Sequence, residues 1–587
     1  MGTERTIARL WKEAVARPRT GPAYLVQHGD HWHEVGWAEA AERVENMANG
    51  LLARGVGKGE AFAIVARTAL EWSLFDFALA QVGAVATPVY PNSSPHDTAY
   101  ILGHSESVGV LCEDARQAAR IEEHRGSLPR LRHVLTFADL PALESDGARF
   151  KAEQPSALDE AVAAVDEEDI FTLQYTSGTT GPPKGCMIRH RNYYAMASVI
   201  DHLPGYVRDD DLMLLYLPLA HNFGRLMHLT GPYVGYTIAF LPDPLQTADA
   251  LLAVRPTVLP SVPRVYEKIH TAVVAAIDET TGVKRWVADW SLEVGRQLGK
   301  RQEEGQPVGA LLHAKARVAD RLVFRTIRER LGGRLRTPIS GGAPLGQEIA
   351  GFFDAIGVRI FEGYGLSECT TAATTNTPVQ WRFGTVGPAL PGFELRIAED
   401  GELLIRSDTV FGGYLKDPVA TAEVLDPDGW LHTGDIAEID GDGFVKITDR
   451  KKDIIVTAGG KNIAPQNLEN DLKASKYISQ AIVVGDRRPF PAALVTLDED
   501  EVSKWAEAQG LRGDTAALAG DPRVIALVQG IVDDVNRERS RYEQIKKFVI
   551  LPRDFTMEQD EVTPTLKLKR RAIMKNFADA VDGLYEQ

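Results

Sequence analysis

The sequence has few cysteines, no excess of positive charge and no long hydrophobic run. Its three cysteines, Cys112, Cys186 and Cys369, are widely spaced among 587 residues. This spacing argues against a zinc site or a disulfide framework and favours a reducing cytoplasm. The formal net charge of -16 argues against a nucleic-acid-binding protein. We therefore expect small-molecule substrates.

The N-terminus has no signal-peptide pattern, because its first twenty residues mix charged and apolar side chains. No later apolar run is long enough to cross a bilayer. These observations predict a cytoplasmic protein and leave peripheral membrane contact open. The length and the 44% hydrophobic content predict two or more structural units, while the choice between monomer and homodimer stays open.

Glycines, hydroxyl side chains and one lysine are concentrated in residues 175–185, YTSGTTGPPKG, after the apolar segment Ile170–Leu173. Glycines allow several backbone N–H groups to face one point, and hydroxyls and a lysine add donors for phosphate oxygens. A plain surface loop has a similar composition. The run is not a Walker A loop, since no Gly-Lys-Ser/Thr follows at the required spacing and Cys186–Ile188 reads as a strand. P-loop kinases and GTPases are therefore disfavoured.

Helical and strand patterns alternate along the N-terminal part. Apolar spacing predicts helices over Trp37–Arg54 and Leu74–Val82, and short apolar runs predict strands over Ala61–Ala66 and Ala84–Tyr90. Such alternation is typical of a parallel sheet covered by helices, an α/β fold. Residues His270–Leu331 predict several amphipathic helices, whose apolar faces either pack on the protein or rest on a membrane.

Further glycine turns and charge clusters follow. Glycine turns lie at Gly341–Pro344 and at Phe361–Glu368. Residues Glu438–Gly443 nearly match a calcium loop, but strand-like flanks predict a hairpin instead. Five charged residues at Asp449–Asp453 indicate an exposed connection between domains. The basic residues Lys569–Arg571 are interpreted as a solvated run.

The YTSGTTGPPKG run resembles the signature loop of the adenylate-forming superfamily, which comprises acyl-CoA synthetases, firefly-type luciferases and peptide-synthetase adenylation domains. Further motifs of that superfamily occur in its order from about Pro22 to Ala572. Two of them, Pro218–Arg225 and Arg255–Glu267, resemble segments of the long-chain fatty acyl-CoA synthetase branch. The resemblance implies a carboxylate, ATP and Mg²⁺ giving acyl-AMP and pyrophosphate, followed by transfer to coenzyme A.

The resemblance also implies a domain organisation. It predicts an N-terminal α/β domain over residues 1–449, with helix-covered, mostly parallel sheets, a β-barrel-like subdomain and a helical segment at 270–331. Residues 450–453 would form a hinge, and residues 454–587 a small mobile α+β domain. Rotation of the small domain would let one site serve both half-reactions.

The superfamily motifs assign roles to individual residues. The implied catalytic residues are Lys567, Glu368, His221 and Lys452, with Glu368 holding Mg²⁺ and Lys452 acting as the pivot of the rotation. The implied ATP and AMP contacts are Thr176, Ser177, Gly178, Thr179, Thr180, Lys184, Gly341, Gly342, Ala343, Pro344, Glu362, Gly363, Tyr364, Gly365, Ser367, Asp435, Ile447 and Arg450. The implied acyl pocket comprises His221, Phe223, Gly342 and Gly365, and the implied coenzyme A channel comprises Gly459, Gly460 and Lys461.

Two parts of the acyl site are less defined by the sequence. The depth of the acyl tunnel is expected to depend on residues within Leu212–Leu241 and Val258–Val265. Some relatives carry a tryptophan gate near the position of Arg225, so the gating residue in this chain is not identified.

Other functions compatible with the motifs stay open. The acyl group could pass to a carrier protein instead of coenzyme A, and the acid could be medium-chain or aromatic. A luciferase-like oxygenase shares the fold, and an inactive nucleotide-binding scaffold belongs to a different functional class. A peptide-synthetase module would need a carrier domain, and the sequence ends at Gln587 without one. The intact set Glu368, Asp435, Arg450 and Lys567 argues against an inactive scaffold.

Overall fold

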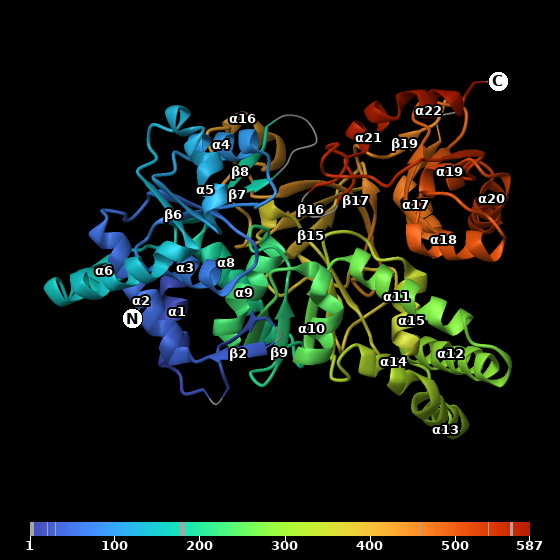
Figure 1. The fold of residues 1–587 in the computed structure, drawn as a ribbon, viewed down its shortest axis with the longest axis horizontal. Helices are drawn as coiled ribbons and strands as arrows, with labels where there is room; N and C mark the ends of the chain where they lie inside the picture. Colours follow the sequence, from blue (N-terminus) through green and yellow to red (C-terminus); the bar gives the residue numbers. More distant parts are fainter. Residues whose placement is uncertain are drawn as a thin grey trace.

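A computed structural model describes residues 5–19, 21–29, 31–176, 182–458, 461–537, 539–563 and 567–586 of the chain. Figure 1 shows a large N-terminal body built on β-sheets and a smaller C-terminal unit at one end. The predicted fold class, α/β with helix-covered, mostly parallel sheets, a β-barrel-like subdomain and a small C-terminal domain, is confirmed, and the β-barrel-like subdomain takes the form of a half-barrel sheet.

A six-stranded sheet forms one half of the N-terminal body. Its strands, in sheet order, are β6 (His133–Thr136), β5 (Gly109–Cys112), β3 (Ala61–Val65), β4 (Val85–Val89), β7 (Ile170–Thr176) and β8 (Lys184–Arg189). All neighbours are parallel except β7 and β8. Every residue of β3 and β4 is buried, as expected for strands covered on both faces. The predicted parallel sheet is confirmed.

An eight-stranded sheet forms the other half. Its strands, in sheet order, are β14 (Thr374–Thr375), β13 (Phe361–Tyr364), β12 (Thr337–Ser340), β11 (Val258–Ser261), β9 (Leu212–Leu215), β10 (Thr237–Phe240), β1 (Tyr24–His28) and β2 (His31–Val35). The strands from β13 to β1 run parallel, and the two edge strands are antiparallel to their neighbours. The carboxyl ends of β9, β12 and β13 therefore meet at one edge of the sheet.

Helices pack against both sheets (Figure 1), while the edge strand β2 stays largely exposed. The α-helices are α1 (Ile7–Ala16), α2 (Trp37–Ala53), α3 (Leu70–Gln81), α4 (Pro95–His104), α5 (Ala115–Glu122), α6 (Leu140–Glu153), α7 (Ala157–Ala163), α8 (His190–Ser198), α9 (Asn222–Val234), α10 (Thr247–Val254), α15 (Gln347–Ala355) and α16 (Pro418–Val424). Short 3₁₀ turns are η1 (Arg125–Ser127), η2 (Phe137–Asp139), η3 (Val199–His202), η4 (Pro244–Gln246) and η6 (Ser367–Cys369). Helix α3 is buried along nearly its whole length, which explains why it is apolar on every side.

A four-stranded antiparallel sheet, the half-barrel, follows in the sequence. It consists of β15 (Glu394–Ile397), β16 (Glu402–Arg406), β17 (Leu431–Ile439) and β18 (Val445–Arg450). The predicted hairpin at the calcium-like segment is confirmed, because Gly443 N–H donates to the Asp440 carbonyl between β17 and β18. Arg382 forms salt bridges with Asp440 and Asp442, so these carboxylates pair with a guanidinium.

The amphipathic segment after β11 forms a helical lobe that projects from the body (Figure 1). It contains α11 (Pro263–Asp278), α12 (Gly282–Glu303), α13 (Ala310–Ala319), the π-helical turn η5 (Asp320–Phe324) and α14 (Arg325–Arg330). Gly295 and Gly299 of α12 lie against residues of α15, and an added Cβ at Gly295 would be 2.2 Å from the Ala355 carbonyl oxygen. This close packing anchors α12 to the body.

The C-terminal unit has hydrophobic cores of its own. Its strands are β19 (Ile455–Val456), β20 (Asn462–Ile463), β21 (Ile478–Val484), β22 (Ala492–Leu497) and β23 (Lys547–Ile550). Its helices are α17 (Pro465–Lys473), α18 (Glu499–Ala508), α19 (Thr515–Ala519), α20 (Pro522–Arg537), α21 (Arg570–Asn576) and α22 (Ala578–Gly583). Two clusters of buried apolar side chains contain only residues from 455 onwards. Within the described residues, no helix combines the length and the apolar character needed to span a bilayer.

Candidate active site

One cavity of about 1610 Å³ lies where the two parallel sheets, the half-barrel and the C-terminal unit meet. It contains almost all of the predicted site residues that the structure describes. They are Thr176, Lys184, His221, Phe223, Gly341, Gly342, Ala343, Pro344, Glu362, Gly363, Tyr364, Gly365, Ser367, Glu368, Asp435, Ile447, Arg450, Lys452 and Lys567. The predicted residues Ser177, Gly178, Thr179, Thr180, Gly459 and Gly460 lie outside the described residues.

The sheet topology brings these distant residues together. His221 follows β9, Gly341 follows β12 directly, and Tyr364 ends β13. All three strands are parallel in one sheet, so their carboxyl ends open into the same space. Thr176, at the end of β7, reaches the cavity from the other sheet.

Two glycines of the site occupy positions that a larger residue would strain. Gly342 has a φ of 84°, in the left-handed region that glycine adopts at low cost. An added Cβ at Gly365 would be 1.9 Å from the Thr371 carbonyl oxygen. The cavity wall is therefore backbone at both places, which leaves room for a flat ligand against it.

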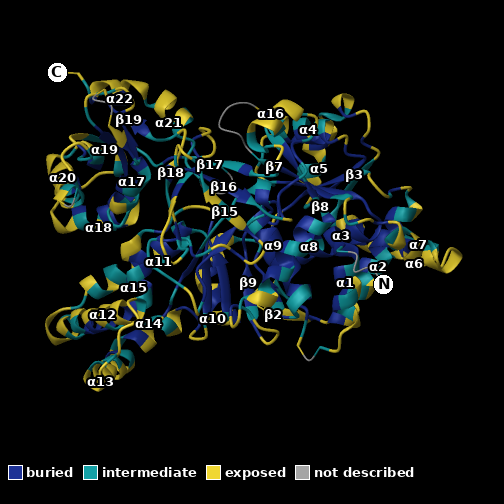
Figure 2. Cartoon of the chain, turned by 180° about the vertical axis from the view of Figure 1, so that it is seen from behind, coloured by how far each residue is buried: buried dark blue, intermediate teal, exposed yellow. Residues whose placement is uncertain are grey.

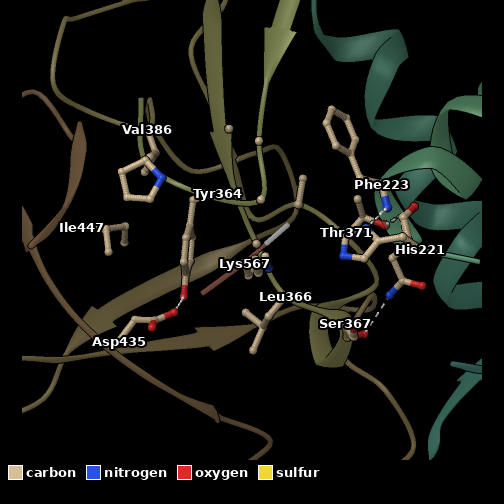
Figure 3. A pocket seen from close by; sticks show the side chains of 18 of the residues that line it. His221, Phe223, Tyr364, Leu366, Ser367, Thr371, Val386, Asp435, Ile447 and Lys567 are labelled. Carbon is tan, nitrogen blue, oxygen red and sulfur yellow. Dashed lines mark hydrogen bonds between the residues drawn. The ribbon is translucent and has the colours of Figure 1, made fainter. Parts of the chain in front are cut away.

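Tyr364, Asp435 and Arg450 form a polar group on one wall. The Tyr364 hydroxyl donates to Asp435 Oδ2 at 2.5 Å, and Arg450 Nε lies 3.6 Å from Asp435 Oδ1. Burial raises the pKa of the Asp435 carboxyl, and the Arg450 charge opposes that shift. Figure 3 shows the Tyr364 ring standing beside Ile447 and Val386. The ring and the carboxylate offer a stacking surface next to a hydrogen-bond acceptor.

Glu368 lies on η6 and also lines the cavity. Its Oε1 accepts a hydrogen bond from the Tyr414 hydroxyl at 2.6 Å, and Lys184 Nζ lies 5.1 Å from the centre of the Tyr414 ring. Burial, followed by the Glu368 charge, raises the pKa of the Tyr414 hydroxyl, so Tyr414 is a donor here. Sequence analysis missed Tyr414, because nothing in its local pattern distinguishes it from a core tyrosine.

The donor set at Glu368 fits Mg²⁺ held mainly by phosphate. Within the described residues, no group of three His, Cys, Asp or Glu side chains is placed to hold a metal ion alone. Mg²⁺ commonly takes one or two carboxylates and completes its octahedron with phosphate oxygens and water. A single carboxylate in the cavity matches that preference for a ligand that brings phosphate oxygens of its own.

His221 caps helix α9 and faces the cavity. Its Nδ1 accepts the Phe223 N–H at 3.2 Å, and burial, with the Lys567 charge second, lowers the pKa of the imidazole to about 3. A neutral ring whose Nδ1 is an acceptor carries its proton on Nε2. His221 thus offers a neutral N–H donor to the cavity, at the place where Figure 3 shows Phe223 and Thr371 beside it.

Lys567 enters the site from the C-terminal unit. Its backbone is held by Thr563, since Lys567 N donates to Thr563 Oγ1 at 3.0 Å and Thr563 N donates to the Lys567 carbonyl at 2.8 Å. Burial, followed by the Arg450 charge, lowers the pKa of the Lys567 amine to about 8, while Asp435 and Glu368 act in the opposite direction. In Figure 3 Lys567 lies between Tyr364 on one side and His221 on the other.

Glu362 behaves differently from the other predicted nucleotide contacts. Its side chain is buried, and its Oε2 accepts the Leu345 N–H at 3.3 Å. Burial raises the pKa of the Glu362 carboxyl to about 8. Burial thus disfavours the charged form, so Glu362 adds less negative charge to the cavity than an exposed carboxylate would.

An apolar branch extends the cavity away from these charges. Its wall consists mainly of side chains from α8, η3, the segment after η3, α9 and the turn between α9 and β10, namely Met196, Val199, Ile200, Leu203, Tyr206, Val207, Leu226, Met227, Thr230 and Tyr236. The expectation for Leu212–Leu241 is therefore partly met. Among the described residues, none of Val258–Val265 lines the cavity, and their effect on the depth of the tunnel stays a prediction. The contribution of residues 196–207 was missed, because their apolar spacing matches that of any packed helix.

Arg225 does not gate the branch. It is fully buried, its Nε and NH2 donate to the two oxygens of Asp76 at 3.2 and 2.5 Å, and its NH1 donates to Thr172 at 2.5 Å. Asp76 lies in the buried helix α3 and Thr172 in β7. Arg225 therefore fixes α9 against the strand that precedes the glycine-rich run.

Two further predicted positions differ from the rest. Lys461 is exposed on the β19–β20 hairpin, 5.7 Å from the centre of the Tyr542 ring, and does not line the cavity.

The interpretation of 569–571 as a solvated run was wrong for Arg570. Its NH2 forms a salt bridge with the buried Glu469 at 2.5 Å, and its NH1 donates to the Val483 carbonyl. Lys569, by contrast, pairs with the exposed Asp560.

Comparisons with known proteins agree with this geometry. Residues 11–415 match the family described as AMP-binding enzyme, and residues 452–587 match the family described as AMP-binding enzyme C-terminal domain. The long-chain-fatty-acid–CoA ligase FadD15 of Mycobacterium tuberculosis is 40% identical over 570 residues, which cover 95% of this chain and 93% of that protein. The peroxisomal long chain acyl-CoA synthetase 6 of Arabidopsis thaliana is 31% identical, with coverages of 95% and 82%.

Solved structures share the fold. The adenylation domain of a carboxylate reductase from Mycobacterium chelonae superposes with a TM-score of 0.76 at 21% identity, covering 99% of this chain and 91% of that domain. The anthranilate CoA ligase AuaEII, solved with anthranoyl-AMP, superposes with a TM-score of 0.75 at 20% identity and 99% coverage of both chains.

Proposed function

This chain belongs to the AMP-binding enzyme family, and on that premise we propose that it is a long-chain fatty acid–CoA ligase. ATP and a fatty acid would give acyl-AMP and pyrophosphate, and coenzyme A would then take the acyl group and release AMP. The observation that carries the proposal is the set of residues that lines the cavity. A polar region with Tyr364, Asp435 and Glu368 continues into an apolar branch beside His221.

In the proposed first step, a carboxylate oxygen of the fatty acid attacks the α-phosphorus of ATP. The bond from that phosphorus to the bridging oxygen breaks, and pyrophosphate leaves with the electron pair. Lys567 would place its ammonium between the incoming carboxylate and the α-phosphate, while the neutral Nε2–H of His221 would donate to the carboxylate. Tyr364 would stack on the adenine, and Asp435 would accept from the ribose hydroxyls. No nucleophilic side chain is required.

Mg²⁺, when bound with ATP, would neutralise phosphate charge and hold the triphosphate in one conformation. Glu368 is the residue that would hold it. Tyr414 would keep the Glu368 carboxylate oriented toward the cavity through its hydrogen bond to Oε1.

The second step would use a different orientation of the C-terminal unit. We propose an N-terminal domain of residues 1–449, a hinge at 450–453 and a C-terminal domain of 454–587. Lys567 occupies the cavity in the present orientation, while Lys461 of the proposed coenzyme A channel faces solvent. Rotation about Lys452 would withdraw Lys567 and bring the β19–β20 hairpin to the acyl-AMP.

An AMP-release assay over a series of acids tests the proposal. Acetate, octanoate, palmitate, oleate and benzoate would each be supplied with ATP and Mg²⁺, with and without coenzyme A. We expect palmitate or oleate to exceed acetate by at least about tenfold in kcat/KM, because added methylenes gain burial in the apolar branch. Highest activity with acetate or benzoate, or acyl-AMP that coenzyme A does not consume, would contradict the proposed substrate or acceptor.

A variant of the apolar branch sharpens this test. Met227→Trp narrows the branch and should lower kcat/KM for palmitate more than for octanoate. Asp435→Ala is the matched control, because Asp435 lies at the polar end. Its loss should lower activity with every acid by a similar factor.

A further inference from the structure

The outer side of the helical lobe exposes apolar side chains. Leu311 and Val318 of α13 and Leu322 of η5 are 71%, 50% and 57% exposed. They are spaced seven and four residues apart, a spacing that places them on one side of a helix. Other apolar residues of the same segment, such as Leu312 and Val323, pack against the core. The lobe thus has an inner apolar side that the protein covers and an outer one that it does not cover among the described residues.

The same segment is strongly basic on an acidic protein. Residues 310–330 contain six basic residues and two acidic ones, whereas the whole chain has a formal net charge of -16. Arg328 pairs with Asp320, and Arg325 pairs with Glu329. Both acidic residues are therefore already paired. The remaining cations, none of which forms a salt bridge with another described residue, are Lys315, Arg317, Arg321 and Arg330.

These cations are interleaved with the exposed apolar residues. Lys315 and Arg317 fall between Leu311 and Val318, and Arg321 falls between Val318 and Leu322. All three cations are exposed. Figure 2 shows α13 as a largely exposed helix at the outer edge of the molecule. Apolar side chains bordered by cations on a protruding helix form an interfacial surface rather than a folding core.

We propose that this outer side of α13 and η5 binds the surface of an anionic lipid bilayer. The three apolar side chains would enter the boundary between headgroups and acyl chains, and the cations would contact the lipid phosphates. Because screening limits electrostatics to about 8 to 10 Å at physiological salt, the local charge of the lobe outweighs the acidic remainder of the chain.

The charges favour a lipid surface over a second copy of the chain. A symmetric contact through α13 would place the unpaired cations of both copies against each other, with no nearby carboxylate left among the described residues of the segment to neutralise them. The exposed apolar residues favour lipid over nucleic acid, because a surface that binds only phosphates gains nothing from Leu311, Val318 and Leu322 at its centre. The proposal concerns a surface outside the cavity, so it does not depend on the proposed reaction.

Flotation of the full chain with vesicles tests the proposal. One set of vesicles would be phosphatidylcholine alone and the other phosphatidylcholine with phosphatidylglycerol. We expect binding to the anionic vesicles at low salt, binding to the neutral ones that is weaker by about tenfold or more, and loss of binding as salt increases. Equal binding to both, or binding to neither, would contradict the proposal.

Two variants separate the contributions of apolar and basic side chains. Leu311→Gln/Val318→Gln/Leu322→Gln should weaken vesicle binding by about tenfold or more, because the buried apolar area is lost. Lys315→Gln/Arg317→Gln/Arg321→Gln should weaken it about 100-fold, given roughly fivefold for each cation near an anionic surface. An unchanged affinity in either variant would overturn the corresponding half of the interface.

Matched controls remove the same residue types elsewhere. Leu245 and Val419 are 90% and 71% exposed on other elements, and Leu245→Gln/Val419→Gln should leave vesicle binding unchanged. Arg116→Gln/Arg120→Gln/Arg130→Gln removes three exposed cations far from α13 in the sequence and should also leave it unchanged. The circular dichroism spectrum and the melting temperature should be the same in all four variants and report correct folding. Sedimentation velocity would show whether the chain forms a dimer. A dimer that Leu311→Gln/Val318→Gln/Leu322→Gln abolishes would contradict the proposal and assign the surface to self-association.

Discussion

The Tyr364 hydroxyl donates to Asp435 Oδ2 at 2.5 Å, so the proposed adenine-stacking ring and the proposed ribose acceptor already contact each other. A ribose hydroxyl that binds Asp435 must share or displace this hydrogen bond. We therefore expect the two residues to act as one unit in the proposed nucleotide binding.

We expect Asp435→Ala to raise the KM for ATP about 100-fold, because two hydrogen bonds to a charged acceptor are lost. Tyr364→Phe keeps the ring and removes only the competing donor, so its KM for ATP should change by no more than a few-fold. Initial rates of AMP release at varied ATP measure both. A larger effect for Tyr364→Phe than for Asp435→Ala would contradict the assignment of the acceptor.

The low pKa of Lys567 predicts an alkaline limit on activity. Its amine has a pKa of about 8 in the present structure, instead of about 10.5 in water. If the ammonium is required, kcat/KM for ATP should fall about tenfold per pH unit above pH 8. Lys567→Arg, where it retains measurable activity, should lack this fall because a guanidinium stays charged. A wild-type profile that stays flat up to about pH 10 would contradict the role of the ammonium.

The same shift predicts a dependence of stability on pH. A lysine whose pKa is lowered by folding binds its proton more weakly in the folded state. Between about pH 8 and about pH 10.5 the unfolded chain therefore holds more protons, and this group's contribution favours folding increasingly as pH rises. Comparing the melting temperature of the ligand-free wild type with that of Lys567→Met at about pH 7 and about pH 9 measures it. The melting temperature of Lys567→Met should exceed that of the wild type by more at about pH 7 than at about pH 9.

The two proposed half-reactions should respond to different lysines. Lys567→Ala should lower acyl-AMP formation by about 10² to 10³, as for loss of a charge-stabilising donor, and should still convert supplied acyl-AMP and coenzyme A to thioester. For Lys452→Ala, thioester formation should be the more impaired step, because Lys452 lies at the proposed hinge. Single-turnover assays of each half-reaction distinguish them. An equal loss of both half-reactions in Lys567→Ala would contradict the assignment of Lys567 to the first step alone.

The hydrogen bond from Tyr414 to Glu368 predicts a positioning effect on Mg²⁺ use. Tyr414→Phe should lower kcat about tenfold and raise the Mg²⁺ concentration needed for half-maximal activity, because Oε1 loses a donor to a charged acceptor. Tyr206→Phe is the control, since Tyr206 also lines the cavity and its hydroxyl contacts Thr375 instead. The Mg²⁺ dependence of that variant should not move. A Tyr414→Phe enzyme with wild-type Mg²⁺ dependence would show that Glu368 needs no such support.

The buried pair of Arg225 and Asp76 predicts a large loss of stability. Both side chains are fully buried, so Asp76→Ala leaves the guanidinium without its carboxylate and should destabilise the fold by about 3 to 5 kcal/mol. Glu329→Ala, which breaks the exposed pair with Arg325, should cost no more than about 1 kcal/mol. Urea unfolding of both variants gives the comparison. Similar midpoints for the two variants would contradict a structural role for the buried pair.

Much of the fold could be predicted from local patterns. The strand over 61–66 and the helix over 37–54 lie within a residue of the observed β3 and α2, because burial on both faces or on one side leaves a periodicity in the sequence. The hairpin at Asp440–Gly443 was also predicted, since strand patterns on both sides exclude the helices that a calcium loop needs. Such signals require only residues that are close in the chain.

Contacts between distant residues left no such signal. Tyr414 reaches Glu368 across 46 positions, and Arg225 reaches Asp76 across 149. Arg570 was expected in solvent but binds a carboxylate of the C-terminal unit that lies 101 positions away, that of Glu469. Tyr414, Arg225 and Arg570 are ordinary residue types in their local patterns. Their structural roles follow only from the distant partners that they contact.

The sequence by itself determined the motifs, their order and the elements that carry them, because hydrophobic periodicity and glycine turns are local properties. Only the tertiary structure decided that these motifs share one cavity and that residues 196–207, from α8, η3 and the segment after η3, line it with mainly apolar side chains. It also decided that the cations of α13 lack carboxylate partners among the described residues. Burial, pKa shifts and pairing depend on which distant surfaces come together, and a local pattern does not specify that partner.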